Sequence, residues 1–460
     1  MLSRPAVLAS RSVPRVAWIV CIAWALCLAS TASGGNVNNG FTNNAVGGIS
    51  IDVNGIVTDA RREDVDTLRR YLLGSVPAVP EPMAPAVELR KISLRGLEAA
   101  ITDAVENKNG VLPDAVKYLG GLQRIHFILV YPEQQDIVLA GPAEGWRVAD
   151  NGTVVGKTTG RPVLLLDDLL VALRTVNAAR EGGISCSIDP TPEGRRALEA
   201  FLTSQRAFNP SVPTRIEQAM GMQTISLTGV PGNSHFARVM VTADYRMKQI
   251  AMKLTPSPVA GLPSFLDLLQ SSRAGLSNMM PRWWLACNYA PLARSEDGLV
   301  WQLRGAGVKV LTEDDIIGAD GAVAESGRKN PVAEKWAEKM TEVYDELSTS
   351  DAIFGQLRNL MDLCVVAAVI AREDLLDRAG LQLPLLTAPH SLMMVDSWNA
   401  PRGVPTRCSF VKQGRTYVLT ASGGVQIESW QVAGRFQVVG DLAEFLRAAP
   451  HAGPDVWWWN

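Results

Sequence analysis

The chain has 460 residues, of which 47% are hydrophobic and 20% are charged. This composition is typical of a folded globular protein and excludes an intrinsically disordered one. The 44 basic and 46 acidic residues nearly balance, and no dense Lys/Arg cluster occurs. A nucleic-acid partner is therefore not expected, because phosphate binding requires a basic surplus.

The first 32 residues are organised like a secretory signal peptide. Three arginines precede an apolar run, Val16–Leu28, and small residues lead up to Ala32. A charged start, a short apolar core and a small-residue exit form the pattern that export machinery recognises. The run is shorter than the roughly 20 residues that span a bilayer. We predict a signal peptide over residues 1–32 and a protein exported to the periplasm, cell envelope or medium, with no membrane span after cleavage. A retained anchor is the alternative.

Residues 33–86 are predicted to contain an Asn/Gly-rich linker, a short hairpin, a helix and a Pro-rich linker. The hairpin rests on alternating apolar residues around Asn54-Gly55, which favours a two-residue turn. The helix is predicted over residues 64–73, where apolar residues recur at helical spacing. The Pro-rich segment 77–85 is expected to be extended and marks a domain boundary.

Residues 87–330 are predicted to form the main region. The expected strands are 87–92, 124–131, 136–140 and 183–188, and the expected helices are 93–107, 167–179 and one from 192. Their alternation predicts an α/β or α+β fold with a mixed sheet and packed helices. A hairpin is expected where residues 300–304 and 308–311 flank a Gly-Ala-Gly turn.

Residues 235–254 are predicted to be a helix capped by Ser234, because apolar residues recur at steps of three and four. Asp244 and Lys248 would then form an ion pair on its outer face. Further along, Asn330-Pro331 predicts the start of a helical hairpin that spans residues 331–386. Residues 387–460 are predicted to form a small β-rich C-terminal region.

Near-matches to catalytic motifs each lack an essential feature. Residues 151–158 lack the first glycine of a phosphate-binding loop, and a strand pair is predicted there instead. Residues 232–236 end in Phe236, where a nucleophile elbow needs a small residue. Residues 326–329 match SxxK but fall in a predicted loop, and residues 313–315 lack the spacing of a calcium loop. The four histidines are scattered, so we predict no metal site, no cofactor and no assigned catalytic residue.

Four cysteines follow the predicted leader: Cys186, Cys287, Cys364 and Cys408. Their wide spacing excludes a CxxC or zinc-knuckle arrangement. An exported protein could join them in up to two disulfides with three possible connectivities. Buried free thiols are the alternative, and the sequence leaves both open.

Two polar groups remain as candidate binding residues. They are Asp244, Tyr245, Arg246 and Lys248 in the first group, and Arg282, Trp283 and Trp284 in the second. Arginine beside tryptophan suits ligand stacking or an interface. The competing structural interpretations are a solvated helix face for the first group and a plug between domains for the second.

Several segments resemble a family of exported bacterial proteins, abundant in planctomycetes, that is known only as a domain of unknown function. The resemblance rests on residues 183–190 (GISCSIDP), 243–248 (ADYRMK), 281–285 (PRWWL), 297–303 (DGLVWQL) and 344–347 (YDEL). It extends over residues 87–386. It implies export and one shared architecture, but no activity, cofactor or catalytic residue.

The leading hypothesis is a non-catalytic exported binding or assembly protein of the periplasm or cell envelope, with a protein or envelope partner. The alternative is a hydrolase with an unrecognised polar site around Asp244, Arg246 and Lys248. A carboxylate beside two cations has a perturbed pKa when it lines a cleft, as catalytic groups often do.

Overall fold

The computed structural model describes residues 46–75, 79–204, 209, 211–272, 281–317, 323–325, 330–388, 397–413, 415–454 and 456–460. All of them belong to one compact unit, Phe41–Asn460. The predicted signal peptide, the Asn/Gly-rich linker and residues 326–329 lie outside the described residues.

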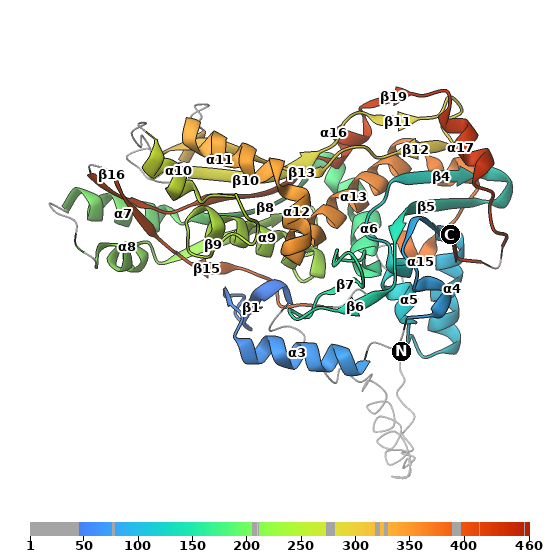
Figure 1. The fold of residues 1–460 in the computed structure, drawn as a ribbon, viewed down its shortest axis with the longest axis horizontal. Helices are drawn as coiled ribbons and strands as arrows, with labels where there is room; N and C mark the ends of the chain where they lie inside the picture. The colour runs from blue at the N-terminus through green and yellow to red at the C-terminus, as the bar shows by residue number, and fades with distance from the viewer. Residues whose placement is uncertain are drawn as a thin grey trace, which may run out of the picture. The chain divides into compact units, whose positions relative to one another are not determined.

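Two seven-stranded mixed sheets organise the fold (Figure 1). The first sheet has the order β14 (Val323–Glu325), β13 (Gly307–Ile317), β10 (Pro281–Asn288), β18 (Ser422–Ile427), β8 (Ile184–Pro190), β9 (Met222–Thr228) and β15 (Gly403–Pro405). The second has the order β19 (Phe436–Val438), β11 (Leu292–Arg294), β12 (Val300–Gln302), β4 (Phe127–Tyr131), β5 (Asp136–Ala143), β3 (Val87–Ser93) and β20 (Trp458–Trp459). Two-stranded pairs are β1 (Ile49–Ile51) with β2 (Val57–Asp59), β6 (Trp146–Val148) with β7 (Val154–Gly156), and β16 (Ser409–Gln413) with β17 (Arg415–Leu419). Mixed sheets with packed helices confirm the predicted fold class.

Helices lie between and around the sheets. The α-helices are α3 (Arg62–Ser75), α4 (Leu94–Asn107), α5 (Asp114–Lys117), α6 (Leu166–Gly182), α7 (Pro192–Ser204), α8 (Val212–Met220), α9 (His235–Ala251), α10 (Phe265–Ser271), α11 (Pro331–Glu342), α12 (Tyr344–Ser350), α13 (Ala352–Arg372), α14 (Leu375–Ala379), α15 (Pro384–Thr387), α16 (Ser429–Ala433) and α17 (Leu442–Ala448). In Figure 1, α6 and α13 lie between the strands of the first sheet and those of the second.

The central helix is α13, which packs against α6, α9, α12 and α16. It is long and apolar enough to cross a membrane, and it is the one such helix among the described residues. Its apolar window is wholly buried within the protein. Its composition is therefore explained by its place in the core, where an apolar helix is surrounded by other elements on every side.

Local sequence determines where several elements begin. The side chain of Ser93 accepts a hydrogen bond from the backbone N–H of Gly96, and Ser234 accepts one from Ala237, so both are the predicted N-caps. Asn330 caps α11 in the same way. The predicted turn at Gly55 joins β1 to β2, with a positive φ of 82°.

The predicted hairpin across residues 305–307 is wrong. β12 pairs with β4 and β11 in the second sheet, whereas β13 pairs with β10 in the first. The chain therefore passes from one sheet to the other here. Gly307 permits the crossing, because its φ is 90° and a Cβ would lie 2.8 Å from the side chain of Arg358. Residues 313–315, which lack the spacing of a calcium loop, lie within β13.

Strands from the predicted C-terminal region complete both large sheets. β18 lies between β10 and β8, β15 lies beside β9, and β20 pairs with β3. The predicted helical hairpin contains α12 packed on α13. It is more broken than expected, because the chain leaves helical geometry at Asp374, where φ is 51°.

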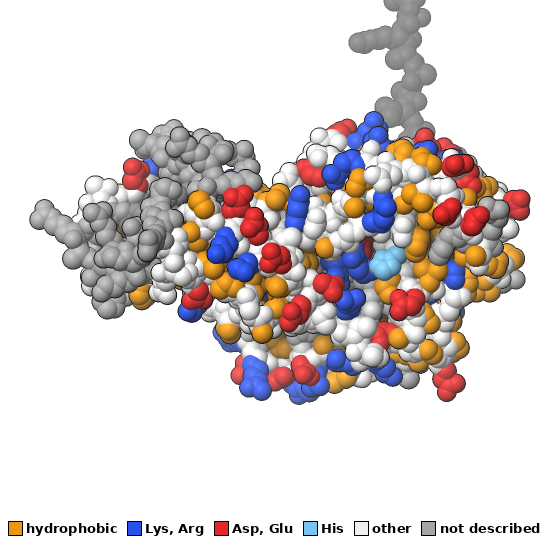
Figure 2. Space-filling model, turned by 45° about the horizontal axis from the view of Figure 1, so that its top comes forward, with side chains coloured by type: hydrophobic (Ala, Val, Ile, Leu, Met, Phe, Trp, Pro, Cys, Tyr) orange, Lys and Arg blue, Asp and Glu red, His pale blue; other side chains and the backbone are white. Residues whose placement is uncertain are grey.

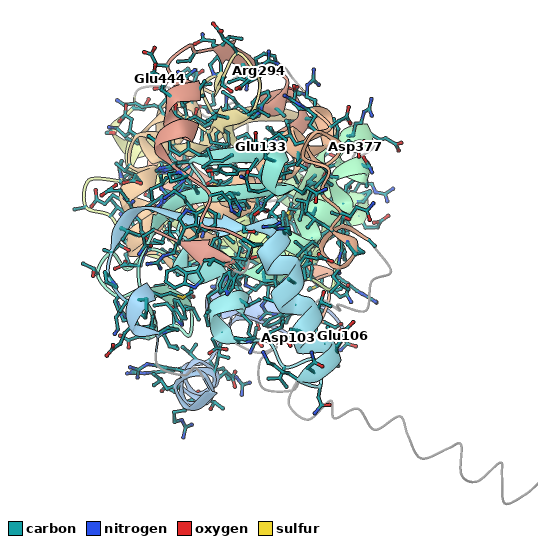
Figure 3. The ribbon with its side chains drawn as sticks, turned by 90° about the vertical axis from the view of Figure 1, so that its right-hand side faces the viewer. Asp103, Glu106, Glu133, Arg294, Asp377 and Glu444 are labelled. Atoms are coloured by element: carbon teal, nitrogen blue, oxygen red, sulfur yellow. The ribbon has the colours of Figure 1, made fainter. Side chains whose placement is uncertain are left out.

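At the end of the molecule drawn in Figure 3, the C-terminal segment lies over the second sheet. In this view Glu444 of α17 and Arg294 of β11 lie near the top of the molecule, and Glu133 lies below them. Leu442 belongs to a small apolar cluster with residues of β4, β5, β11 and β12, and Trp459 packs against this cluster. This cluster is separate from the main core, which lies on the other side of the same sheet.

Candidate interior polar site

The helix that carries the first candidate group is almost entirely buried. Every residue of α9 except Arg246 is buried, because the helix contacts β8 and β18 on one side and α6 and α13 on others. The helix itself is confirmed. The predicted outer-face ion pair is wrong in its location, since Asp244 is 0% exposed and Lys248 only 6%.

Asp244 and Lys248 join α9 to the first sheet. Lys248 Nζ donates to Asp244 Oδ2 at 2.8 Å and to the backbone oxygens of Ile188 at 3.2 Å and Gly423 at 3.3 Å. Asp244 Oδ1 is buried without a hydrogen-bond partner. Burial raises the pKa of Asp244 to about 6, although the charge of Lys248 acts in the opposite direction.

Two glycines allow the strands to approach closely at this point. A Cβ on Gly424 would overlap the carbonyl oxygen of Cys186 in β8, and a Cβ on Gly423 would overlap the carbonyl oxygen of Trp283 in β10. Gly423 also has a φ of 118°, which favours glycine. The close packing brings the carbonyl oxygen of Gly423 within reach of Lys248.

The remaining two residues of the first group do not join the ion pair. The Arg246 guanidinium donates to Asp351 Oδ2 from Nη2 at 3.1 Å and to Gln249 Oε1 from Nη1 at 2.9 Å. Tyr245 is 8% exposed, and burial raises its pKa to about 12. The four predicted residues therefore do not form one site. Asp244 and Lys248 bond to each other, whereas Arg246 bonds to Asp351 and Gln249.

The second candidate group is divided between core and sheet. Trp283 is 0% exposed and packs edge-on against Phe265 at 5.2 Å and at a tilt against Trp336 at 4.8 Å, measured between ring centroids. Trp284 is half-buried, with the Arg282 guanidinium 4.6 Å from its ring centroid. Trp283 is a core residue, and no partner could contact it without displacing the core.

Arg282 is close enough to take part in the electrostatics of Asp244. Its Nη2 lies 3.8 Å from Asp189 Oδ1, and its positive charge lowers the pKa of Asp244, whereas the negative charge of Asp189 raises it. Asp244, Lys248, Arg282 and Asp189 thus form one electrostatic group, in which Asp244 and Lys248 are buried and Arg282 and Asp189 are partly exposed. The structure brings these residues together beneath the first sheet and leaves Arg246 outside.

A second buried polar group links the two sheets and α13. Arg124 donates from Nε and Nη2 to both oxygens of Asp362 at 2.8 Å, and Tyr289 donates its hydroxyl to Asp362 Oδ1 at 2.6 Å. Burial acts to raise the pKa of Asp362, but Arg124 and Tyr289 outweigh it and hold this pKa below its usual range. Sequence analysis missed this bidentate pair, because its members are 238 positions apart.

Two histidines are also held by carboxylates. His235 Nδ1 lies 3.0 Å from Asp168 Oδ1; burial tends to lower the pKa of His235, but the charge of Asp168 raises it overall. His451 Nε2 lies 2.7 Å from Asp136 Oδ2, which also accepts the hydroxyl of Ser93. Asp136 lies between the serine and the histidine, so His451 does not contact Ser93 as the histidine of a Ser-His-Asp triad contacts its serine.

The four described cysteines are free thiols. Cys186, Cys364 and Cys408 are buried and Cys287 is half-buried. Burial raises the pKa of each thiol, so none carries the thiolate character of a reactive cysteine. Of the two possibilities left open by the sequence, the structure shows free thiols.

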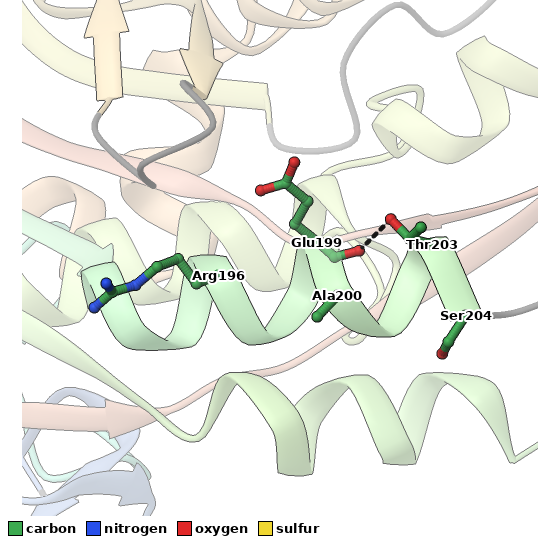
Figure 4. Close-up of a pocket in the computed structure, with 5 residues that line it drawn as sticks. All are labelled: Arg196, Glu199, Ala200, Thr203 and Ser204. Carbon is green, nitrogen blue, oxygen red and sulfur yellow. Dashed lines mark hydrogen bonds between the residues drawn. The ribbon is translucent and has the colours of Figure 1, made fainter.

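Neither described cavity is lined by these polar groups, although the Trp459 ring at the second cavity lies 5.1 Å from the His451 ring, between centroids. One is a shallow depression of about 470 Å³ along a single helix, α7, lined by Arg196, Glu199, Ala200, Thr203 and Ser204 (Figure 4). The other, of about 270 Å³, lies at the second sheet and includes Lys91 and Trp459. Within the described residues, no group of three or more His, Cys, Asp or Glu side chains could hold a metal ion.

One protein-family model matches part of the chain. Residues 186–265 match a family described as a protein of unknown function, DUF1598. This segment begins in β8 and includes α9, with Asp244 and Lys248. It contains two of the five segments on which the expected resemblance rests, 183–190 in part and 243–248 in full. No curated protein and no solved structure matches the chain.

The DUF1598 segment does not enclose the buried ion pair by itself. Gly423, which accepts a hydrogen bond from Lys248, belongs to β18, and α13, which covers α9, lies outside the segment too. The family supplies neither an activity nor a ligand.

Proposed function

We propose that the chain is a non-catalytic binding protein that is exported to the periplasm, the cell envelope or the medium. The observation that carries the non-catalytic part of this proposal is the arrangement of its ionisable groups. Four pairs of ionisable side chains are largely buried, and within each pair the two side chains bond to each other. They are Asp244–Lys248, Arg124–Asp362, His235–Asp168 and His451–Asp136. Neither described cavity is lined by any of them.

A hydrolytic role for Asp244 requires a substrate to reach it. The raised pKa of Asp244 would suit a general acid or base, but its carboxyl group is 0% exposed between a helix and a sheet. Structural ion pairs perturb pKa values in the same way. The geometry favours attachment of α9 to the sheet over chemistry.

The outer surface is consistent with a partner other than nucleic acid. On the face drawn in Figure 2, acidic and basic side chains are interspersed. Polyanion binding would require basic side chains gathered without intervening acidic ones. Export is supported by the charged, apolar and small-residue order of the first 32 residues.

A substrate panel tests the non-catalytic role. The purified protein is assayed with chromogenic esters, phosphate esters, glycosides and peptides, alongside Asp244→Asn, with circular dichroism to verify folding. We expect no turnover above the no-protein control. Turnover that is lost in a folded Asp244→Asn variant would establish the hydrolase alternative instead.

A further inference from the structure

One face of the first sheet is open to solvent. Along β8 and β9, buried residues alternate with accessible ones. The buried residues Cys186, Ile188 and Ile225 belong to the main core, and α9 packs on that side of β8. The side chains between them point to the opposite side, because neighbouring residues of a strand face opposite sides of a sheet. We call this side the outer face of the first sheet.

Five hydroxyl side chains lie side by side on the outer face. In the antiparallel pairing of β8 with β9, Ser185 lies opposite Thr228 and Ser187 lies opposite Ser226, and Thr224 continues the row along β9. The three residues of β9 are exposed, and the two serines of β8 are half-buried. None of the five hydroxyls bonds to another residue in the described part of the chain. Each can therefore donate one hydrogen bond to a ligand and accept others from it.

Trp284 lies in the same row. Trp284 of β10 is paired with Gly424 of β18, and Gly424 is paired with Ser187. Because Gly424 has no side chain, no side chain of β18 stands between the half-buried indole ring and the serine. The indole N–H is not among the buried atoms and bonds to no described residue. At about 4.8 Å between strands, the row from Trp284 to Ser226 is about 14 Å long.

A protein partner does not suit the outer face. Such an interface needs a contiguous apolar patch. The large exposed apolar side chains of this face are Leu311 of β13 and Met222 of β9, and β10, β18 and β8 lie between those two strands. The apolar area is therefore divided, and hydroxyl groups lie in the middle.

A polyanion does not suit the outer face either. The Arg282 guanidinium lies 4.6 Å from the ring centroid of Trp284, but its Nη2 is 3.8 Å from Asp189 Oδ1, so its charge is balanced. Lys309 is the other cation among the described side chains of this face. One lysine is fewer than the several cations that bind a phosphate tract.

We infer that the outer face of the first sheet binds a neutral polysaccharide chain, with a sugar ring on Trp284 and sugar hydroxyls bonded to the serines and threonines of β8 and β9. A sugar ring presents C–H groups on its faces and hydroxyl groups around its rim, which match an aromatic ring beside free hydroxyls. An extended chain suits an open row better than a closed cavity does. This inference rests on the proposed binding role and names the partner.

Affinity electrophoresis in gels that contain hydroxyethylcellulose, glucomannan, laminarin or dextran tests the inference, with heparin as the polyanion. Trp284→Ala removes the ring. Trp430→Ala is its matched control, because Trp430 is also half-buried, with the Arg180 guanidinium 5.2 Å from its ring centroid, and lies in α16. Ser226→Arg places a long charged side chain across the row, and Ser350→Arg is its control at an exposed serine of α12. Circular dichroism verifies the folding of each variant.

We expect at least one neutral polysaccharide to retard the wild type. Trp284→Ala and Ser226→Arg should weaken this binding about tenfold, whereas Trp430→Ala and Ser350→Arg should bind like the wild type. Binding should be the same at about 50 mM and about 500 mM NaCl, because a neutral chain releases no counter-ions.

Absence of retardation by every neutral polysaccharide would overturn the inference, as would equal binding by the wild type and the two outer-face variants. Heparin binding that weakens with salt, without binding to a neutral chain, would assign a polyanion instead. If Trp284→Ala does not fold, the comparison of Ser226→Arg with Ser350→Arg decides. These outcomes leave the proposed non-catalytic role intact, which fails on turnover in the substrate panel instead.

Discussion

Asp244 shows how burial changes the meaning of a polar side chain. Its i,i+4 spacing to Lys248 was read correctly from the sequence, and the two groups do bond at 2.8 Å. The buried location of this pair was not predicted, because a polar pair at helical spacing normally faces solvent. The backbone oxygens of Ile188 and Gly423 satisfy Lys248 in the interior, and sequence spacing does not predict such distant acceptors.

Replacing Asp244 by asparagine should change how stability depends on pH. Burial raises the pKa of Asp244 to about 6 in the folded chain, from 3.8 for an ordinary aspartate, so the folded state holds the proton more tightly. The stabilising effect of that proton is fully present below pH 3.8 and is lost as pH rises through 6. The wild type should therefore lose about 3 kcal/mol relative to Asp244→Asn over this range.

Urea denaturation of both proteins at several pH values between 4 and 7 measures that difference. Glu133→Gln removes an exposed carboxylate and is the control. A wild-type stability that runs parallel to that of Asp244→Asn across the range would contradict a buried, raised-pKa carboxyl group.

Substitution of Asp362 is predicted to lower the free energy of unfolding far more than substitution of an exposed acidic residue. Its removal leaves the Arg124 guanidinium, of which 11% of the side chain is exposed, without its bidentate partner. We expect Asp362→Ala to lower the free energy of unfolding by about 3–5 kcal/mol. Asp150→Ala, which removes an ion-pair partner that is 95% exposed, should change it by less than about 1 kcal/mol. Chemical denaturation checks both, and similar effects would contradict the structural role of Asp362.

At the scale of elements, the start of a helix could be predicted where it depends on residues that are neighbours in sequence. Ser93, Ser234 and Asn330 cap the helices that they were predicted to cap. The hairpin across residues 305–307 was wrong, because two strands flanking a glycine turn normally pair with each other. Here each strand finds a better-matched neighbour in a different sheet, and that choice depends on long-range packing.

The Gly423-Gly424 pair is predicted to be essential for the first sheet. Gly424→Ala places a methyl group on the carbonyl oxygen of Cys186, within the backbone of a neighbouring strand. Backbone cannot move aside as a flexible side chain does, so we expect a loss of several kcal/mol or no folded protein. Gly182→Ala, near the end of α6 with open space around it, should be neutral or slightly stabilising. Thermal melting distinguishes them, and a folded Gly424→Ala of wild-type stability would contradict the strand packing.

At the scale of the whole molecule, composition and alternation predicted the fold class, and the structure confirms it. The order of the strands in the two sheets could not be predicted from the sequence. β18 and β15 come from the predicted C-terminal region, residues 387–460, and complete a sheet whose other strands lie far earlier. For the candidate site, the sequence indicated which residue types were of interest but not how they are arranged. The surroundings of Asp244 are created by contacts between segments that are distant in sequence.

Cell fractionation followed by mass spectrometry of the mature chain tests the proposal of an exported binding protein most directly. The full-length chain is expressed in a bacterial host with a C-terminal tag, and the intact mass is determined for the cytosolic, membrane, periplasmic and medium fractions. We predict a chain that begins at Ser33 outside the cytosol. A chain that retains Met1 and stays in the cytosolic fraction would contradict export.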